Sequence, residues 1–190
     1  MSNKKENVSV AKPKIGGAIF KAPCDNTKIP SDAKTALDSS FKCCGYVSDD
    51  GVVFSTSEKS EDVKSWGNEV VTTLDSDFTD EFEVTYIESM NEEVLKEYHG
   101  EGAVKGTIDT GITVNIAPNK QDYKMIVIDM ILNKGKVLKR IVIPRCKVSD
   151  KSDVTYKDDE VIAYKLKYAC ATGYDDGTYH KEFISKVEGK

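Results

Sequence analysis

The sequence predicts a mainly β protein: an antiparallel β-sandwich or partial barrel with one short flanking α-helix and a long loop between two strands. Three observations support this fold class. Most apolar residues lie in short extended or alternating segments that are separated by turn signals. Only one segment has capping signals of a helix at both of its ends. The strands follow one another along the chain, which favours antiparallel pairing over a parallel sheet with crossover helices.

Extended segments and turns fill the first half of the chain. Pro23 ends the first strand, and Asp49-Asp50-Gly51 predicts a turn because glycine tolerates a positive φ. A short helical turn is expected over Asp32–Leu37, with Ser31 as its cap. The expected strands are Gly16–Ala22, Phe41–Ser48, Val52–Phe54, Glu69–Leu74 and Phe82–Glu88, the last of which alternates as a half-buried strand does.

The one expected helix covers Glu92–His99. Asn91 is a good N-cap, and the acidic residues of the first turn favour the helix dipole. Met90 and Leu95 have the spacing of a hydrophobic staple, and Gly100 fits a C-terminal stop. A helix this short is marginal alone, so it should pack on a sheet.

Strands dominate the second half. Tyr123–Leu132 is the most apolar segment, which predicts a core strand, and Pro144 indicates an edge, a bulge or a bend. Gly173–Gly177 reads as a hairpin turn, so the final strand should return along the strand before it. The expected strands are Ile112–Ala117, Tyr123–Leu132, Val137–Val148, Thr155–Tyr156, Glu160–Thr172 and Thr178–Ile184.

Length and composition fit a single domain. We expect a flexible N-terminal arm over residues 1–13, one β-sandwich domain over residues 14–185 with a protruding loop at 55–67, and a polar tail over residues 186–190. No apolar run approaches the ~18 residues of a membrane helix, so no membrane partner is expected. The polar start of the chain does not resemble a secretory signal, which predicts synthesis in a cytoplasm.

Charge is distributed unevenly along the chain. Residues 49–101 have 16 acidic residues and three lysines, whereas the remaining residues have 16 acidic and 24 basic residues. The fold can mix these charges again, or it can separate them into an acidic and a basic face, which favours head-to-tail self-association. No basic cluster resembles a nucleic-acid-binding surface.

The segment Ser55–Gly67 carries the strongest functional signal. It is long, polar and charged, and it contains the only tryptophan, Trp66. Long loops in compact domains are usually functional, and a single large aromatic residue on such a loop indicates binding to another protein or another copy of the chain. The candidate inter-subunit contact residues are Glu58, Glu61, Asp62, Lys64 and Trp66.

The sequence offers little for catalysis. The two histidines, His99 and His180, have no metal-ligand spacing, and the acidic clusters do not match a calcium loop. Phosphate-binding and nucleophile motifs are absent. The five cysteines form no CxxC pair and should be reduced. We therefore expect no catalytic residues, no cofactor and no bound metal.

Several segments together resemble the major tail tube proteins of long, non-contractile-tailed bacteriophages. The resemblance runs from about Gly16 to His180 and rests on the order of the pieces rather than on any one of them. The pieces are GGAIFKAP, TALDSSFKCCGYVSDDGV, SEDVKSWGNEVV, IESMNEEVLKEYHG, VIDMILNKGKVLKRIVIPRCKV and VTYKDDEVIAYKLKY.

The resemblance implies a structural protein that self-assembles into rings, expected to be hexameric, which stack as a hollow tube through which DNA passes without specific binding. The loop 55–67 would then lie between rings or subunits. The implied partners are other copies of the chain, a tape-measure protein, a tail terminator and a distal tail or initiator protein. The implied location is the virion tail, assembled in the host bacterial cytoplasm.

Two alternatives stay open at this point. The same β fold can serve as a capsid-decoration or other binding module that does not polymerise. An enzyme on a β-barrel, for example a metal-dependent hydrolase, would need a deep pocket or a metal and would depend on His99 or His180. A tube of a phage-derived bacteriocin cannot be separated from a phage tail tube by sequence.

Overall fold

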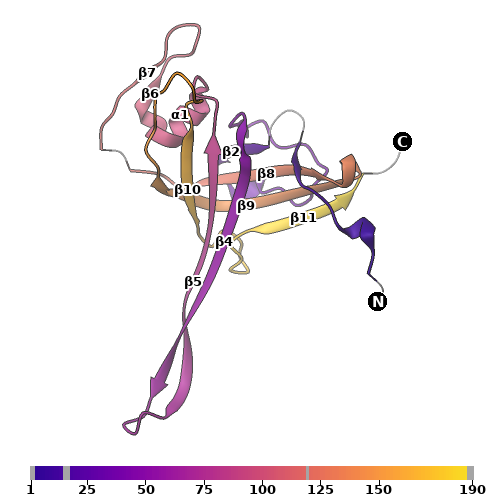
Figure 1. Ribbon diagram of the computed structural model, residues 1–190, viewed down its shortest axis with the longest axis vertical. Coiled ribbons are helices and arrows are strands. Elements are labelled where there is room, and N and C mark those ends of the chain that lie inside the picture. Colours follow the sequence, from indigo (N-terminus) through magenta and orange to yellow (C-terminus); the bar gives the residue numbers. More distant parts are fainter. Residues whose placement is uncertain (1–2, 15–17, 119, 188–190) are drawn as a thin grey trace.

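The computed structural model describes residues 3–14, 18–118 and 120–187, and it confirms a mainly β, antiparallel, sandwich-like fold with one α-helix (Figure 1). The helix α1 spans Glu92–His99. Short 3-10 helices lie at Lys5–Asn7, Asn26–Lys28, Glu101–Ala103 and Asn133–Gly135. The strands are β1 (Lys12–Pro13), β2 (Ile19–Pro23), β3 (Lys42–Cys43), β4 (Val47–Lys64), β5 (Val70–Tyr86), β6 (Val104–Lys105), β7 (Thr113–Val114), β8 (Lys124–Leu132), β9 (Val137–Lys151), β10 (Tyr164–Cys170) and β11 (Lys181–Lys186).

Nine of these strands form one bent antiparallel sheet with the order β3-β2-β8-β9-β10-β5-β4. Along one edge of β8, the strands β1 and β2 pair one after the other. Along one edge of β9, β10 and β11 do the same. Figure 1 shows that β8, β9 and β11 run across the long axis while β4, β5 and β10 run along it. The described strands do not close into a barrel.

The expected hairpin between the last two strands is wrong. A turn is present after β10, because the N–H of Gly177 donates to the carbonyl of Tyr174. However, β11 pairs with the first half of β9, from Val142↔Lys181 to Val137↔Lys186, whereas β10 pairs with the second half. After β10 the chain loops out, and β11 then pairs with β9 at a place further along the edge on which β10 lies. A long strand such as β9 offers two successive pairing sites on one edge, which a local turn signal does not reveal.

The helix is confirmed with the expected bounds. The side chain of Asn91 accepts a hydrogen bond from the N–H of Glu93, and Gly100 ends the helix with a φ of 102°. Val94 and Leu95 are buried in the core against the sheet, together with residues such as Phe82 and Leu166. The expected hydrophobic staple between Met90 and Leu95 does not form, because Met90 is 70% exposed.

Several expected elements are shorter than the sequence indicates. Asp32 rather than Ser31 caps the turn that follows it, since its carboxylate accepts from the N–H groups of Lys34 and Thr35, and no helix forms there. The strand expected over Phe41–Ser48 is interrupted around Gly45, whose φ is 71°.

The remaining differences concern the other turns and short strands. Gly51 lies in an irregularity of β4 rather than in a turn. Within Ile112–Ala117, only Thr113–Val114 is strand, and residues 155–156 are irregular. Pro144 is confirmed as an irregular position, because the β8–β9 register shifts opposite it. Gly16 and Gly17 of the first expected strand lie outside the described residues.

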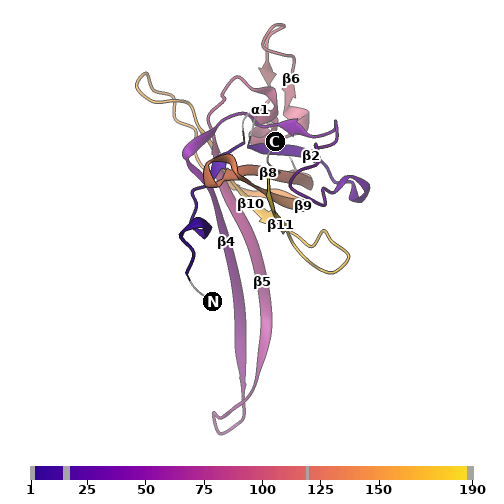
Figure 2. The ribbon, with the colours of Figure 1, turned by 90° about the vertical axis from the view of Figure 1, so that its right-hand side faces the viewer.

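The largest difference concerns the loop expected at Ser55–Gly67. The structure continues β4 through Lys64 and begins β5 at Val70, so that these residues form a β-hairpin with a short tip. Figures 1 and 2 show this hairpin projecting far beyond the rest of the molecule. The polar composition was misleading because both faces of the projecting part are in solvent, and the alternation that reveals a half-buried strand is therefore absent.

Candidate assembly surface

The projecting hairpin, here called the arm (residues 55–80), is one continuous antiparallel ladder. Its register runs from Ser55↔Glu81 at the root to Lys64↔Val70 near the tip, with irregularities at Lys59/Ser60 and Val63/Lys64. At each irregularity β5 has one extra residue, which strengthens the local twist of the ladder. From Ser55 to Lys64, every residue of β4 is exposed. The arm is thus held by its own ladder and by little else beyond its root.

The root of the arm is joined firmly to the body by aromatic rings. Phe54 on β4 lies 5.5 Å from Phe82 on β5, measured between ring centroids. Phe82 in turn stacks on Tyr168 of β10 at 4.5 Å with an angle of 4° between the rings. Aromatic pairs of this kind add to the free energy gained by burying their area. The arm therefore leaves the body from a rigid base.

A histidine–aspartate pair strengthens the same root. Nδ1 of His180 lies 2.6 Å from Oδ2 of Asp80, whose side chain is buried. The hydrogen bond to Asp80 raises the pKa of His180 against the opposing effect of burial. The ring of His180 also lies 5.2 Å from that of Phe54. The segment before β11 is thereby tied to the beginning of the arm.

The tip of the arm presents the only tryptophan to solvent. The N–H of Ser65 donates to the carbonyl of Glu69, and the N–H of Asn68 donates to the carbonyl of Ser65, at 2.8 and 2.9 Å. Asn68 has a φ of 63°, a conformation that asparagine tolerates better than most residues. These bonds close a tight turn around Trp66, whose side chain is fully exposed. An indole in this position is available to another molecule.

The structure brings all five sequence-predicted contact residues together on the arm. Glu58, Glu61, Asp62 and Lys64 lie on β4 and are exposed, as is Trp66 at the tip. Alternation along β4 places Glu58, Asp62 and Lys64 on one face of the ladder and Glu61 on the other. The carboxylate of Asp62 accepts a hydrogen bond of 2.9 Å from the hydroxyl of Thr73 across the ladder.

Sequence reasoning missed the apolar residues of the arm. Large apolar side chains are exposed beside the charges, most of them on β5. They are Val63, Val70, Val71, Leu74 and Phe78. The β-branched and apolar residues of the second strand of the arm were a usable signal. It was missed because the first strand was interpreted as a loop, so that the second strand had no pairing partner. Apolar groups on an exposed hairpin indicate a surface that another molecule covers.

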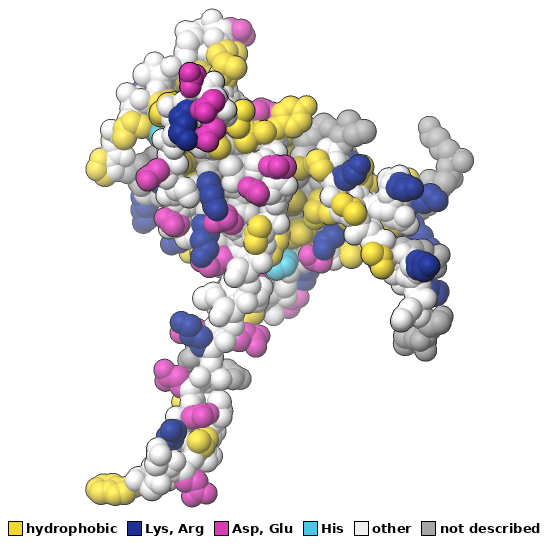
Figure 3. Space-filling model, in the orientation of Figure 1, with side chains coloured by type: hydrophobic (Ala, Val, Ile, Leu, Met, Phe, Trp, Pro, Cys, Tyr) yellow, Lys and Arg dark blue, Asp and Glu magenta, His cyan; other side chains and the backbone are white. Residues whose placement is uncertain are grey.

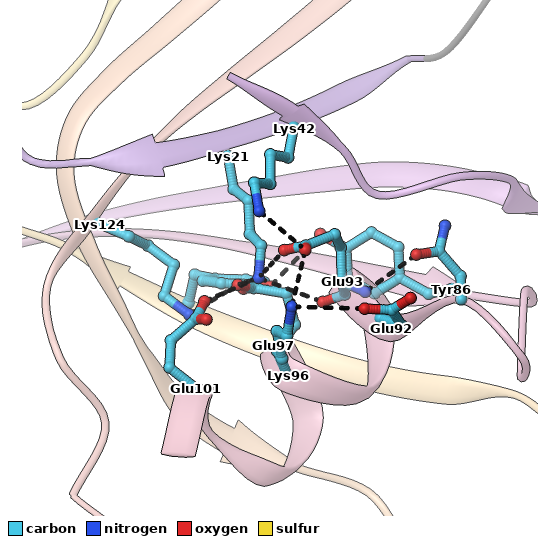
Figure 4. Close-up of polar contacts among 11 residues, drawn as sticks. Lys21, Lys42, Tyr86, Glu92, Glu93, Lys96, Glu97, Glu101 and Lys124 are labelled. Atoms are coloured by element: carbon cyan, nitrogen blue, oxygen red, sulfur yellow. Dashed lines mark hydrogen bonds and ion pairs between the residues drawn. The ribbon is translucent and has the colours of Figure 1, made fainter. Parts of the chain in front are cut away.

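A second polar cluster lies in the body, between α1 and the sheet (Figure 4). The carboxylate of Glu97 is completely buried. Its Oε1 lies 2.8 Å from Nζ of Lys124 and 3.2 Å from Nζ of Lys21, and its Oε2 accepts a 2.7 Å hydrogen bond from the hydroxyl of Tyr168. The helix is thereby fastened to β2, β8 and β10 at one point.

Charges in this cluster are balanced by their neighbours. Burial alone would lower the pKa of Lys21, but the carboxylates around it, Glu97 foremost, raise the pKa above its usual value. Burial would raise the pKa of Glu93, but hydrogen bonds from Lys21 and Lys96 lower it to about 2. Both shifts favour the charged forms, so the ion pairs persist at neutral pH.

The described residues contain neither a group of side chains placed to hold a metal ion nor a helix able to span a membrane. In residues 3–14, 18–118 and 120–187, no group of His, Cys, Asp and Glu side chains is placed to hold a metal ion. No helix within the same ranges has the length and apolar character to span a bilayer.

Comparison with known proteins identifies the family of the chain. A family model described as phage tail tube protein matches residues 1–188. A search of curated protein sequences finds no match. Among solved structures, the chain is similar to the tube-terminating cap of the anti-feeding prophage, with 9% identity and a TM-score of 0.39 over 98% of this chain and 100% of that chain. The family match carries the weight, because it spans nearly the whole sequence.

Proposed function

Because the chain belongs to the phage tail tube protein family, and is thus a structural protein of the tail rather than an enzyme, we propose that it is the repeating subunit of the tube. Copies of the chain assemble into rings, six to a ring, and the rings stack into a hollow tube through which DNA passes. The tube lies in the virion tail and is assembled in the host bacterial cytoplasm. One domain over residues 14–185 forms each subunit, and residues 1–13 and 186–190 complete their contacts on assembly.

The arm is the observation that carries this proposal. An isolated two-stranded hairpin is only marginally stable in water, and this one projects with exposed apolar residues on its second strand and a bare indole at its tip. A neighbouring subunit that covers the arm would stabilise the hairpin and remove its apolar side chains from water. Glu58, Glu61, Asp62, Lys64 and Trp66 are therefore proposed as the contact between rings.

The proposed passage of DNA fits the charge of the chain. Its net charge is −5, so the molecule as a whole carries no excess of positive charge with which to hold phosphate. The proposed partners beyond other copies of the chain are a tape-measure protein inside the tube, a tail terminator at one end and a distal tail or initiator protein at the other. Each of these must bind one open face of a ring or the inner wall.

Replacement of Trp66 tests the proposal. We expect Trp66→Ala to fold as the wild type does, because its side chain contacts solvent, but to reduce tube yield by about tenfold or more, as loss of an interface aromatic residue does. Tube yield is measured by sedimentation and negative-stain electron microscopy. Tyr46→Ala is the matched control, since Tyr46 is also an exposed aromatic residue but lies outside the arm.

Trp66 also serves as its own reporter. As the only tryptophan, it is the main source of fluorescence excited at the red edge of the spectrum, and its emission should shift to shorter wavelength when a neighbouring subunit covers it. Wild-type tube yield in Trp66→Ala, together with unchanged emission on assembly, would remove the arm from the contact.

A further inference from the structure

The arm holds the entire net charge of the molecule. Between Ser55 and Asp80 there are seven acidic residues and two lysines, a net charge of −5, and the rest of the chain has 25 residues of each sign. Glu58, Glu61 and Glu69 are exposed and have no ion-pair partner within the described chain. An unpaired acidic surface with apolar residues among its charges needs a basic, partly apolar partner.

A surface of the opposite kind lies at the far end of the sheet. We call it the basic end and define it as residues 3–14, 130–139 and 184–187, which contain eight lysines and one glutamate. Strand pairing builds it: Lys12 is opposite Ile131 on β8, Ile131 is opposite Leu138 on β9, and Leu138 is opposite Ser185 on β11. Four strands, β1, β8, β9 and β11, therefore lie side by side at this end of the sheet.

The lysines of the basic end are available. Lys139 pairs with Glu182, and Lys14 lies 3.5 Å from Asp129. The other six lysines are exposed and have no ion pair among the residues that the structure describes: Lys4, Lys5, Lys12, Lys134, Lys136 and Lys186. Figure 3 shows Lys and Arg side chains gathered at this end, to the right of the view.

Apolar side chains accompany these lysines, as they accompany the carboxylates of the arm. Val8 and Val10 are 81% and 75% exposed, and Ile184 on β11 is 60% exposed. Such residues, scattered among unpaired charges, match the composition of the arm with the sign of the charge reversed. The two surfaces are thus complementary in charge and alike in apolar content.

Within one molecule the two surfaces do not meet. Figures 1 and 3 show the outer part of the arm pointing away from the body at one side and the basic end lying at the other. A contact between two different surfaces of identical chains is heterologous, and it repeats from copy to copy into a ring or a filament. We propose that the arm of one subunit docks on the basic end of a second copy.

This inference rests on the proposed function and deepens it by naming the receiving surface of the arm. Rings that stack through it all face the same way along the tube, because each subunit presents an acidic arm towards one neighbour and a basic end towards the next. Wrong contacts, arm to arm or end to end, place like charges together and are disfavoured.

A charge exchange in the full-length chain tests the docking. Lys134→Glu/Lys136→Glu reverses two exposed residues in the β8–β9 turn, and Glu58→Lys/Glu61→Lys reverses two on the arm. Lys134 already has a φ of 55°, which glutamate meets with the same backbone cost as lysine. Each double variant should raise the concentration needed for assembly by about tenfold or more, and the chain with all four changes should assemble close to the wild-type concentration.

Sedimentation velocity measures association of any kind, and electron microscopy identifies tubes. Circular dichroism and urea unfolding must match the wild type, which confines the effects to association. Tubes from both double variants at the wild-type concentration would overturn the docking and leave the proposed function standing. Charge-dependent association that the fourfold variant restores, but with closed oligomers instead of tubes in every sample, would overturn the proposed function and leave the docking standing. A wild-type chain that stays monomeric, both alone and after addition of a tail initiator complex, overturns both.

Discussion

Glu97 links three elements of the body to the helix through one buried carboxylate. Its partners are Lys21, Lys124 and Tyr168, which lie far apart in the sequence. Lysine and glutamate are usually surface residues, so sequence patterns gave no reason to place them inside. A buried carboxylate of this kind costs free energy to desolvate and is tolerated because each of its oxygens is paired.

Removing this charge should destabilise the body strongly. Glu97→Gln leaves the buried ammonium of Lys124 without the carboxylate that pairs with it at 2.8 Å. We expect the free energy of unfolding to fall by about 3–5 kcal/mol, as it does when one partner of a buried pair is lost. Urea unfolding of the monomer measures it. Glu92→Gln, which removes a partly exposed carboxylate 3.8 Å from Lys96, should cost less than about 0.5 kcal/mol; equal losses in the two variants would contradict this role for Glu97.

His180 should make the stability depend on pH. Its hydrogen bond to Asp80 raises the pKa in the folded state above the value of about 6.5 in the unfolded chain. The stabilisation is then complete below the unfolded-state pKa and disappears as the pH rises through the folded-state pKa. Wild-type protein should lose more free energy of unfolding between about pH 6 and pH 9 than His180→Gln does. Parallel pH profiles of the two proteins would show that the pair contributes nothing.

At the scale of elements, local signals were sufficient for the helix and insufficient for the arm. The N-cap, the first-turn carboxylates and the terminal glycine of Glu92–His99 are all close in sequence, and the helix has the expected bounds. The arm has no buried face outside its root, so periodicity could not identify its first strand. The candidate residues nevertheless lie together on a projecting segment, because charge and a lone tryptophan do not depend on the type of backbone.

The pairing of β11 shows the other limit of sequence reasoning. The turn at Gly173–Gly177 exists, but which strand the chain joins after it depends on the free edge of β9. That edge is available because β9 has 15 residues and β10 covers only its second half. Strand partners of this kind are set by the whole sheet.

Hydrogen exchange should separate the arm from the body. In the monomer, amides of residues 57–64 and 70–77 should exchange much faster than those of β8, because the arm buries few apolar groups while β8 lies in the core. On assembly the arm amides should become protected, and those of β8 should stay slow. Exchange in the arm that is equally slow in the monomer would mean that its ladder is stable without a neighbour.

At the scale of the whole molecule, the fold separates acidic from basic residues. The sequence was compatible both with this separation and with a surface on which the charges are mixed. The acidic arm leaves from one side and the lysine-rich basic end lies at another, so a single chain has two unlike surfaces that cannot satisfy each other (Figure 3). A contact between two such unlike surfaces can repeat head to tail from copy to copy. This property links the arm, the sheet topology and the proposed tube.

Negative-stain electron microscopy of the purified wild-type chain, concentrated at moderate salt, shows whether the chain builds a tube. We expect hollow tubes of uniform width that are built from stacked rings of six subunits. Monomers or closed trimers, both alone and after addition of a tail initiator complex, would contradict it and favour a binding module that does not polymerise.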